Sequence, residues 1–258
     1  MVDGLVSVIM PSWNTAEYIG ESIESVINQT YSNWELLIVD DCSTDNTDEI
    51  VAKYLGDRRI KYFHNNTNSG AALTRNYALR EAQGEWIAFL DSDDIWAPEK
   101  LDKQLEFMKK YNYYLSYTEY EKIDENDNPL NIYVSGPKVV NKRRMYNYDY
   151  IGQLTMIYSS KVFGLIQIKD IKKNNDYAIR LKLFKKANVE AHLLNENLAK
   201  YRVRKKSISH DKLRKKLKSH YDLFHYCDDN NALLALLYSI NNMWFGVLKK
   251  IRYESNIK

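Results

Sequence analysis

The sequence has little of several features that mark particular protein classes. Its 258 residues include two cysteines, Cys42 and Cys227, which are too few for a disulfide scaffold and fit a reducing compartment. Lysine and arginine total 37 against 34 aspartates and glutamates, and a net charge of +3 gives no sign of nucleic-acid binding. No basic residue precedes the first apolar run, so we expect no secretory signal, and no apolar stretch looks long enough to span a bilayer.

Several catalytic motifs are also absent. The chain has neither GxGxxG nor GxxxxGK[ST], which disfavours Rossmann dinucleotide binding and P-loop chemistry. It has no HExxH or CxxC pair for zinc and no GxSxG motif for a serine nucleophile. A bound nucleotide diphosphate would therefore have to be neutralised by a metal ion and basic side chains.

The first hundred residues contain a regular alternation of apolar runs and helical patterns. This βαβ order is typical of an α/β fold with a doubly wound, mostly parallel sheet and helices on both faces. We expect strands at residues 5–10, 35–39, 60–63 and 86–90, and helices at 18–27, after 45, at 71–82 and after Pro98.

Polar clusters follow three of these strands. They are Ser12-Trp13-Asn14, Asp40-Asp41 and Asp91-Ser92-Asp93-Asp94. Ligands of open α/β sheets bind at the carboxyl ends of the strands, so three such clusters predict a crevice there. The last cluster could hold Mg²⁺ or Mn²⁺ through its carboxylates, or could cap a helix ahead of Pro98, and the residues alone leave both readings open.

The second half of the chain has a weaker pattern. We expect two strands within residues 113–134 joined by a turn at 124–129, a loop over 135–150, and a strand at 154–159. A helix should begin at Asn174 to Asp176, followed by two short strands at 189–194 and 198–203.

The tail is basic and then apolar. Ten basic residues stand against one acid between residues 200 and 218, and the apolar segment 232–248 is interrupted by Asn241 and Asn242, so we expect it to be too short to span a bilayer. The tail could lie on an anionic membrane as an amphipathic helix, or pack on the domain or on a second subunit in a homodimer.

Five ordered motifs together resemble the family 2 glycosyltransferases. The resemblance is dense over residues 5–115 and looser at 175–177 and 201–209. The motifs are VIMPSWN at 8–14, SVINQT at 25–30, VDDCSTD at 39–45, NSG at 68–70 with Arg75 and Asn76, and FLDSDD at 89–94.

The resemblance implies a GT-A fold and a set of site residues. Residues 1–112 would form the nucleotide-sugar-binding half, 113–205 the acceptor-binding half, and 206–258 a helical tail. Trp13 replaces the usual tyrosine but keeps a flat face for stacking on uracil. The implied donor-binding residues are Pro11, Trp13, Asn14, Asp41, Arg75, Asp91 and Ser92, the metal ligand for Mn²⁺ or Mg²⁺ is Asp93, and the catalytic base is Asp176.

The implied reaction is an inverting transfer of a hexose (glucose, galactose or an N-acetylated form) from a UDP-sugar to a saccharide acceptor on a lipid diphosphate carrier. It would serve bacterial surface polysaccharide synthesis, in the cytoplasm or peripherally on the inner face of the membrane. Asp176 could instead cap a helix, and Asn175 replaces the glutamate that the family often has. Two further readings are a nucleotidyltransferase, which usually has a glycine-rich loop where this chain has residues 11–14, and a non-catalytic scaffold, against which Asp93 and Asp176 argue.

Overall fold

The computed structural model describes residues 1–204 and 213–256, and its first part follows the predicted alternation. The elements are β1 (Val2–Ser12), α1 (Ile19–Ile27), β2 (Trp34–Asp40), α2 (Thr47–Ala52), β3 (Ile60–His64), α3 (Gly70–Glu81), β4 (Gly84–Phe89), β5 (Ile95–Trp96) and α4 (Lys100–Tyr111). Each of the four expected strands and four expected helices is present, with ends that differ by a few residues. The α/β fold class is confirmed.

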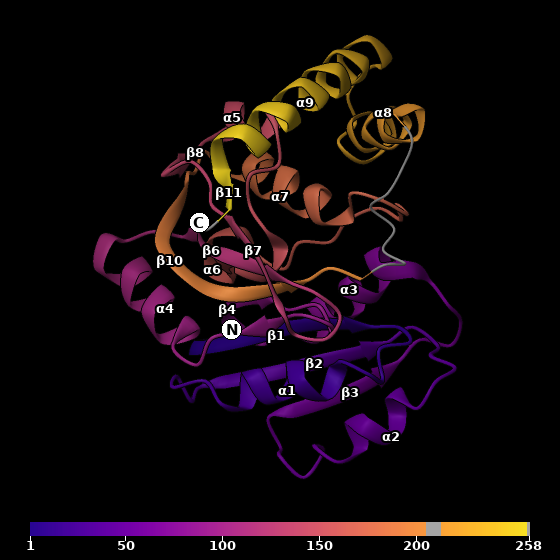
Figure 1. Ribbon diagram of the computed structural model, residues 1–258, viewed down its shortest axis with the longest axis vertical. Helices are drawn as coiled ribbons and strands as arrows, with labels where there is room; N and C mark the ends of the chain where they lie inside the picture. The colour runs from indigo at the N-terminus through magenta and orange to yellow at the C-terminus, as the bar shows by residue number, and fades with distance from the viewer. Residues whose placement is uncertain (205–212, 257–258) are drawn as a thin grey trace.

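The described strands form one mixed sheet, which Figure 1 shows running through the middle of the molecule. Its main path is β11-β7-β6-β9-β4-β1-β2-β3. The pairs β1–β2, β1–β4 and β2–β3 are parallel, as the βαβ order requires, whereas β9 pairs antiparallel with both β4 and β6. The carboxyl ends of β1, β2 and β4 therefore share one edge.

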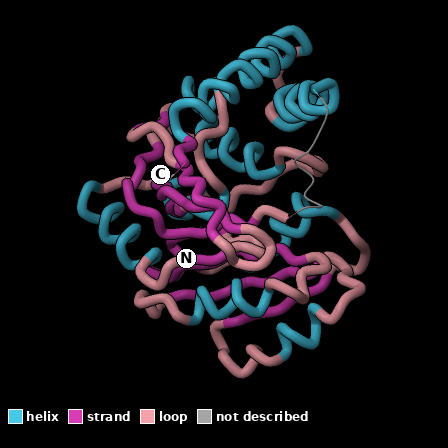
Figure 2. The backbone as a smooth tube through the Cα atoms, in the orientation of Figure 1, coloured by secondary structure: helices cyan, strands magenta, loops and turns pink. Residues whose placement is uncertain are grey.

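The helices cover both faces of this sheet, because successive side chains of a strand point to opposite sides. Val8 and Met10 of β1 pack with the apolar residues of α1 and α4 on one face. Ile9 lies on the other face with those of α3 and α7. Figure 2 shows the helices, in cyan, distributed around the magenta strands.

The middle of the chain departs from expectation in one segment. The hairpin is present as β6 (Leu115–Ile123) and β7 (Pro129–Val134), and the expected strand becomes η1 (Gln153–Thr155) and β9 (Ile157–Ser159), with α6 (Ser160–Phe163) after it. The prediction of a loop over residues 135–150 was wrong, since β8 (Val139–Val140) and α5 (Lys142–Asn147) lie there. Met145 is the one buried residue of α5, so the segment shows no apolar repeat.

The two short strands expected after α7 (Asn175–Lys186) are one strand, β10 (Ala191–Arg202). It runs parallel to β6 along most of its length, with register shifts between residues 194 and 200. Asn195, Glu196 and Asn197 fall in this irregular stretch. The polar interruption read from the sequence is therefore a bulge within a strand rather than its end.

The tail forms α8 (Leu213–Asp222), η2 (Leu223–Cys227), α9 (Ala232–Tyr253) and β11 (Glu254–Asn256). The expectation that its apolar segment is too short to span was wrong, because α9 has 22 residues and is apolar enough, by length and composition, to cross a membrane. The basic residues Lys205, Lys206 and Lys212 lie outside the described residues. Figure 1 shows α8 and α9 at the end of the molecule opposite α2.

Candidate active site

The polar clusters that follow β1 and β2 meet at the shared edge of the sheet. Ser12 pairs with Asp40 in the β1–β2 register, and the backbone N–H of Asp41 donates to the carbonyl of Ser12 at 2.9 Å. Ile9 pairs with Phe89, so the segment that begins at Asp91 follows on the other side of β1. The three predicted clusters therefore belong to one edge, as the sheet topology requires.

Asp41 is buried and its carboxylate organises the turn before α3. Its Oδ1 accepts from the backbone N–H of Ser69 and from the Asn65 side chain, and its Oδ2 accepts from the backbone N–H of Gly70, each at 2.7 Å. Gly70 has a φ of +81°, which favours glycine. Asp41, predicted to bind the donor, thus also holds the amino end of α3.

Arg75, on α3, lies between two carboxylates from distant parts of the chain. Its Nη2 donates to Oδ1 of Asp91 at 2.5 Å, and its Nη1 lies 2.7 Å from Oδ1 of Asp176 and also donates to the Asn175 side chain. Only 5% of the Arg75 side chain is exposed. The structure therefore brings together three predicted site residues, Arg75, Asp91 and Asp176, and excludes a solvated surface role for Arg75.

The electrostatics of this triad favour a charged arginine. Burial alone would lower the pKa of Arg75, but the neighbouring Asp176 and Asp91 carboxylates outweigh burial and raise it. Among the described residues the Nε of Arg75 has no hydrogen-bond partner. The guanidinium is thus permanently charged and held at the point where α3, α7 and the end of β4 meet.

Asp176 lies in the first turn of α7 rather than at its cap. The N-cap residue is Asn174, with a φ of +57°, and in the described part of the chain no side chain makes the capping hydrogen bond. The Asp176 carboxylate is directed to Arg75 and is 37% exposed. A negative charge in the first turn is also stabilised by the helix dipole. The ion pair that Asp176 forms is with Arg75 of the site.

The acidic segment after β4 is not a cap for α4. Residues 91–94 are followed by β5, and α4 begins at Lys100 with Glu99 as its N-cap. Ser92 and Asp94 are buried, and Asp93 is partly exposed. The reading of this cluster as a helix cap ahead of Pro98 is therefore excluded.

The carboxylates of this segment repel one another. Burial raises the pKa of Asp93; Arg204 opposes that rise and Asp91 adds to it. Burial, together with Asp93 and Asp91, raises the pKa of Asp94 well above its usual value. Full ionisation of this segment is therefore costly, and a bound cation or a basic side chain such as Arg204 would relieve the repulsion.

Two arginines at the end of β10 complete the surroundings of this segment. The Arg202 backbone N–H donates to Oδ1 of Asp94 at 3.0 Å, and its Nε donates to the carbonyl of Asp93 at 2.8 Å. Arg204 lies with its Nε 3.0 Å from Oδ2 of Asp93. Sequence reasoning counted both within a basic run, and the segment Tyr201-Arg202-Val203 was the signal that could have placed them at the site.

Trp13 and Asn14 lie in the loop that follows β1, at the carboxyl edge of the sheet. Trp13 is 54% exposed, so its indole face is open to solvent. Asn14 has a φ of +51°, and its Oδ1 accepts from the backbone N–H of Thr44 at 2.7 Å, which joins the loops after β1 and β2. Pro11 is partly buried at the end of β1, two residues before this exposed ring.

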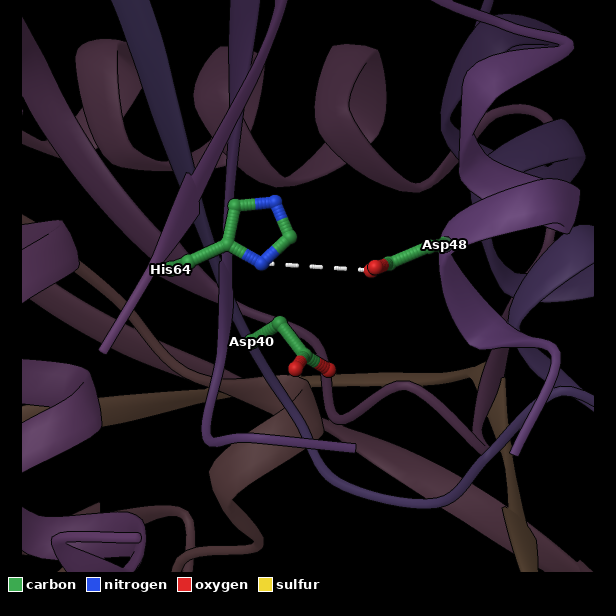
Figure 3. A group of neighbouring side chains, drawn as sticks. All are labelled: Asp40, Asp48 and His64. Carbon is green, nitrogen blue, oxygen red and sulfur yellow. Dashed lines mark ion pairs between the residues drawn. The ribbon is translucent and has the colours of Figure 1, made fainter. Parts of the chain in front are cut away.

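A second group of possible metal ligands, which no sequence motif predicted, lies beside this edge. Asp40, Asp48 and His64 have ligand atoms within 4.8 Å of one another, and Figure 3 shows the three side chains facing a common point. Asp40 accepts from Ser43, Asp48 accepts from the hydroxyl of Tyr62, and His64 Nδ1 lies 3.9 Å from Asp48. These contacts join β2, β3 and α2.

The fold and the site define an α/β protein with acidic residues that are bridged by an arginine at the carboxyl ends of its parallel strands. The model of the family described as "Glycosyl transferase family 2" matches residues 7–167. The chain belongs to this family and is a glycosyltransferase.

Curated relatives match most of the chain. It is 42% identical over 209 residues to a putative teichuronic acid biosynthesis glycosyltransferase, TuaG, of Bacillus subtilis, covering 81% of this chain and 82% of that one. It is 39% identical over 249 residues to an Escherichia coli UDP-Glc:alpha-D-GlcNAc-diphosphoundecaprenol beta-1,3-glucosyltransferase, WfgD, covering 96% of each chain.

Solved structures show the same fold. S. aureus TarS 1-349 in complex with UDP-GlcNAc has a TM-score of 0.69 at 24% identity, covering 89% of this chain and 69% of that one. A mannosyltransferase of Pyrobaculum calidifontis in complex with GDP-Man and Mn²⁺ has a TM-score of 0.65 at 17% identity, covering 94% and 75%. The GT-A type of α/β fold, with a helical C-terminal tail, is confirmed.

Proposed function

We propose that this enzyme transfers a hexose, such as glucose, galactose or an N-acetylated form, from a UDP-sugar to a saccharide on a lipid diphosphate carrier, with inversion at the anomeric carbon. It would act in bacterial surface polysaccharide synthesis. The observation that carries the proposal is the Asp91–Arg75–Asp176 triad, which places a partly exposed carboxylate from the second half of the chain beside the acidic edge of the first half.

The choice of donor and acceptor is supported by the relatives. The name of WfgD gives UDP-Glc as its donor and a diphosphoundecaprenol-linked sugar as its acceptor, and the match to it covers 96% of this chain. TarS, of the same fold, is described in complex with UDP-GlcNAc. The exposed face of Trp13 would stack on the uracil, with Pro11, Asn14 and Asp41 around it.

The residues divide the chemistry between two halves. Residues 1–112 would bind the donor, with Asp91 and Ser92 on its ribose side and Arg75 near its phosphates, and residues 113–205 would bind the acceptor. Asp93 would hold Mn²⁺ or Mg²⁺, which would stabilise the charge that develops on the leaving nucleoside diphosphate. Arg204 now lies against that carboxylate and would have to share it or move.

Asp176 would act as the general base. A sugar hydroxyl is a weak nucleophile at neutral pH, and a carboxylate within hydrogen-bond reach can take its proton as the oxygen attacks. One base and one direct displacement invert the anomeric carbon. The contact with Arg75 fixes the Asp176 carboxylate at the crevice and leaves more than a third of it open to an acceptor. An acceptor on a lipid would place the enzyme peripherally on the cytoplasmic face of the membrane.

The proposal is tested by release of UDP from UDP-glucose, UDP-galactose and their N-acetyl forms, with and without Mn²⁺ or Mg²⁺. We expect release with one donor class, dependent on the metal. In Asp176→Asn, transfer should fall by about 10²–10⁴-fold while the fold and donor binding persist. Asp93→Asn should lower activity and weaken its dependence on metal concentration.

Asp102→Asn is the matched control, because Asp102 also lies in the first turn of a helix, α4, and is exposed away from the site. It should transfer sugar at the wild-type rate. Full transfer by Asp176→Asn would remove that residue from the mechanism. Absence of UDP release with every donor and metal would overturn the proposed UDP-hexose donor.

A further inference from the structure

We propose that the exposed face of α9, with the basic residues around it, is a docking surface for an anionic lipid bilayer. The outer face of α9 is defined here by six apolar side chains, each more than half exposed, from 54% for Ile240 to 78% for Ile251. Its members are Leu233, Leu237, Ile240, Trp244, Val247 and Ile251.

These six residues form one continuous stripe. They follow one another at intervals of three or four residues, so at 3.6 residues per turn they fall within an arc of about 60° to 80° along the full helix. Soluble proteins expose single apolar side chains freely, but a long contiguous stripe of large ones marks an interaction surface. The outer face of α9 is such a stripe.

The inner face of the same helix consists of small, polar and aromatic side chains, and Tyr238 packs against Phe224 and Tyr146. The residues of α9 that are buried are Ala235, Ser239 and Asn242. Asn242 donates from Nδ2 to the hydroxyl of Tyr177 at 2.8 Å, and Asn241 donates to the side chain of Asn147 at the same distance. The helix is therefore held to α7, α5 and η2 by small, polar and aromatic side chains, and it turns its stripe of large apolar side chains outward.

These attachments exclude a membrane-spanning role for α9, although its length and composition would allow one. Its carboxyl end continues into β11, which pairs antiparallel with β7, and Ser135 donates from its backbone N–H to the carbonyl of Tyr253 at 2.9 Å. Crossing a bilayer would break the sheet pairing and leave the polar face in lipid. An orientation parallel to the membrane surface keeps every one of these contacts.

Charge decides between a bilayer and a second copy of the chain as the occupant. α9 has no aspartate or glutamate, and its exposed Lys250 and Arg252 flank the stripe at its carboxyl end. The neighbouring helix α8 exposes Arg214, Lys215, Lys216 and Lys218. Two such basic surfaces would repel each other across a symmetric dimer, whereas each would be attracted to anionic headgroups.

The surface also lies next to the segment that carries the proposed base. A cavity of about 580 Å³ between α8 and the loop before α7 is lined by four lysines and two aspartates, namely Lys172, Lys173, Lys215, Lys218, Asp170 and Asp222. Tyr177, which contacts α9, directly follows Asp176. Resting on the proposed function, this arrangement would hold the Asp176 side of the crevice close to the membrane that carries the acceptor.

Flotation of the full-length protein with phosphatidylcholine vesicles, with and without phosphatidylglycerol, tests the proposal. We expect binding to the vesicles that contain phosphatidylglycerol, and a decrease of about tenfold or more in bound protein for Ile240→Gln/Trp244→Gln. Lys250→Gln/Arg252→Gln should bind about tenfold less and show a weaker salt dependence, because the basic residues of α8 remain. Leu55→Gln/Leu130→Gln, at exposed apolar residues elsewhere, should float like the wild type.

Three results would overturn the proposal. They are failure of the wild type to float with phosphatidylglycerol, wild-type flotation by Ile240→Gln/Trp244→Gln, and a dimer in solution that this variant converts to monomer without any vesicle binding. Flotation needs neither donor nor acceptor. Vesicle binding without UDP release would therefore disprove the proposed function alone, and UDP release without vesicle binding would disprove the docking surface alone.

Discussion

Helices α4 and α9 both carry an apolar stripe, but they turn it in opposite directions. In α4, Leu101, Leu105 and Met108 lie in the core with the apolar residues of α1. In α9, residues such as Ile240 and Trp244 are exposed, and the side that packs on the protein carries small, polar and aromatic side chains. The spacing of apolar residues therefore shows which side of a helix is apolar, but not whether that side faces the core or the solvent.

The same contrast holds for the two regions to which these helices belong. The apolar cluster on one face of the sheet lies mostly within the first 112 residues, whereas the cluster on the other face includes side chains of α7 and of the tail. The region from residue 174 onward adds polar and ionic contacts, including Arg75 with Asp176 and Arg180 with Asp149. Arg75 contacts both regions, so we expect its substitution to have the largest effect on stability.

Arg75→Met should destabilise the protein by about 3–5 kcal/mol and abolish transfer. Removing a buried cation leaves Asp91 and Asp176 without their common partner in a site where charge is costly. Urea unfolding followed by circular dichroism measures the change in the free energy of unfolding.

Arg80→Met, on the same helix, is the control, because Arg80 is exposed and donates one 3.3 Å bond to Gln167. It should change the free energy of unfolding by less than about 0.5 kcal/mol. Equal effects of the two variants would mean that Arg75 does not join the two regions.

The second test compares the stripes of α4 and α9 directly. Leu105→Ala should lower the free energy of unfolding by about 3 kcal/mol, because it leaves a cavity in the core. Leu237→Ala, on the outer face of α9, should change it by less than about 0.5 kcal/mol, because that side chain is already in water. Thermal and urea unfolding of the two variants in buffer without lipid measures both values, and similar losses would show that α9 is covered in solution.

Sequence-based prediction succeeded for elements with a continuous apolar pattern and failed for elements without one. The strands β1, β2 and β4 were predicted because each is a continuous apolar run that ends at polar residues. The helix α5 was missed because its six residues bury a single side chain, Met145. The strand β10 was divided in two because the polar residues 195–197 form a bulge, which has no signal in the apolar pattern.

The site was predictable as a list of residues but not as a set of contacts. Asp41, Asp91 and Arg75 follow from motifs at strand ends, and Asp176 from a looser match about a hundred residues later. That Arg75 pairs with Asp176 depends on the packing of α3 against α7, which a single sequence does not give. Arg204 was missed because only the fold brings the end of β10 to Asp93.

Helix α4 also buries two polar residues, Lys100 and Gln104, so its buried polar groups can be compared with those of α9. Lys100 is fully buried, donates from Nζ to Oε1 of Gln104 at 2.8 Å and lies 4.4 Å from the centroid of the Trp96 ring. Burial lowers the pKa of Lys100 from 10.5 to about 7. In α4 a fully buried polar group thus has a charge that is costly near neutral pH. In α9 the fully buried Ser239 and Asn242 are uncharged, although burial also lowers the pKa of Lys249 beside the Tyr148 ring.

Lys100→Met should therefore change how stability depends on pH. Between pH 7 and 10 the unfolded chain binds a proton that folded wild type does not, so the wild type should gain stability relative to the variant as the pH rises, by about 1–3 kcal/mol from pH 7 to pH 9. Below about pH 7 both states of the wild type hold the proton, and the difference should be constant. Urea unfolding at pH 6, 7, 8 and 9 measures it. Lys103→Met, which removes an exposed partner of Glu196, should show no such rise, and parallel profiles for wild type and Lys100→Met would mean that Lys100 stays charged throughout.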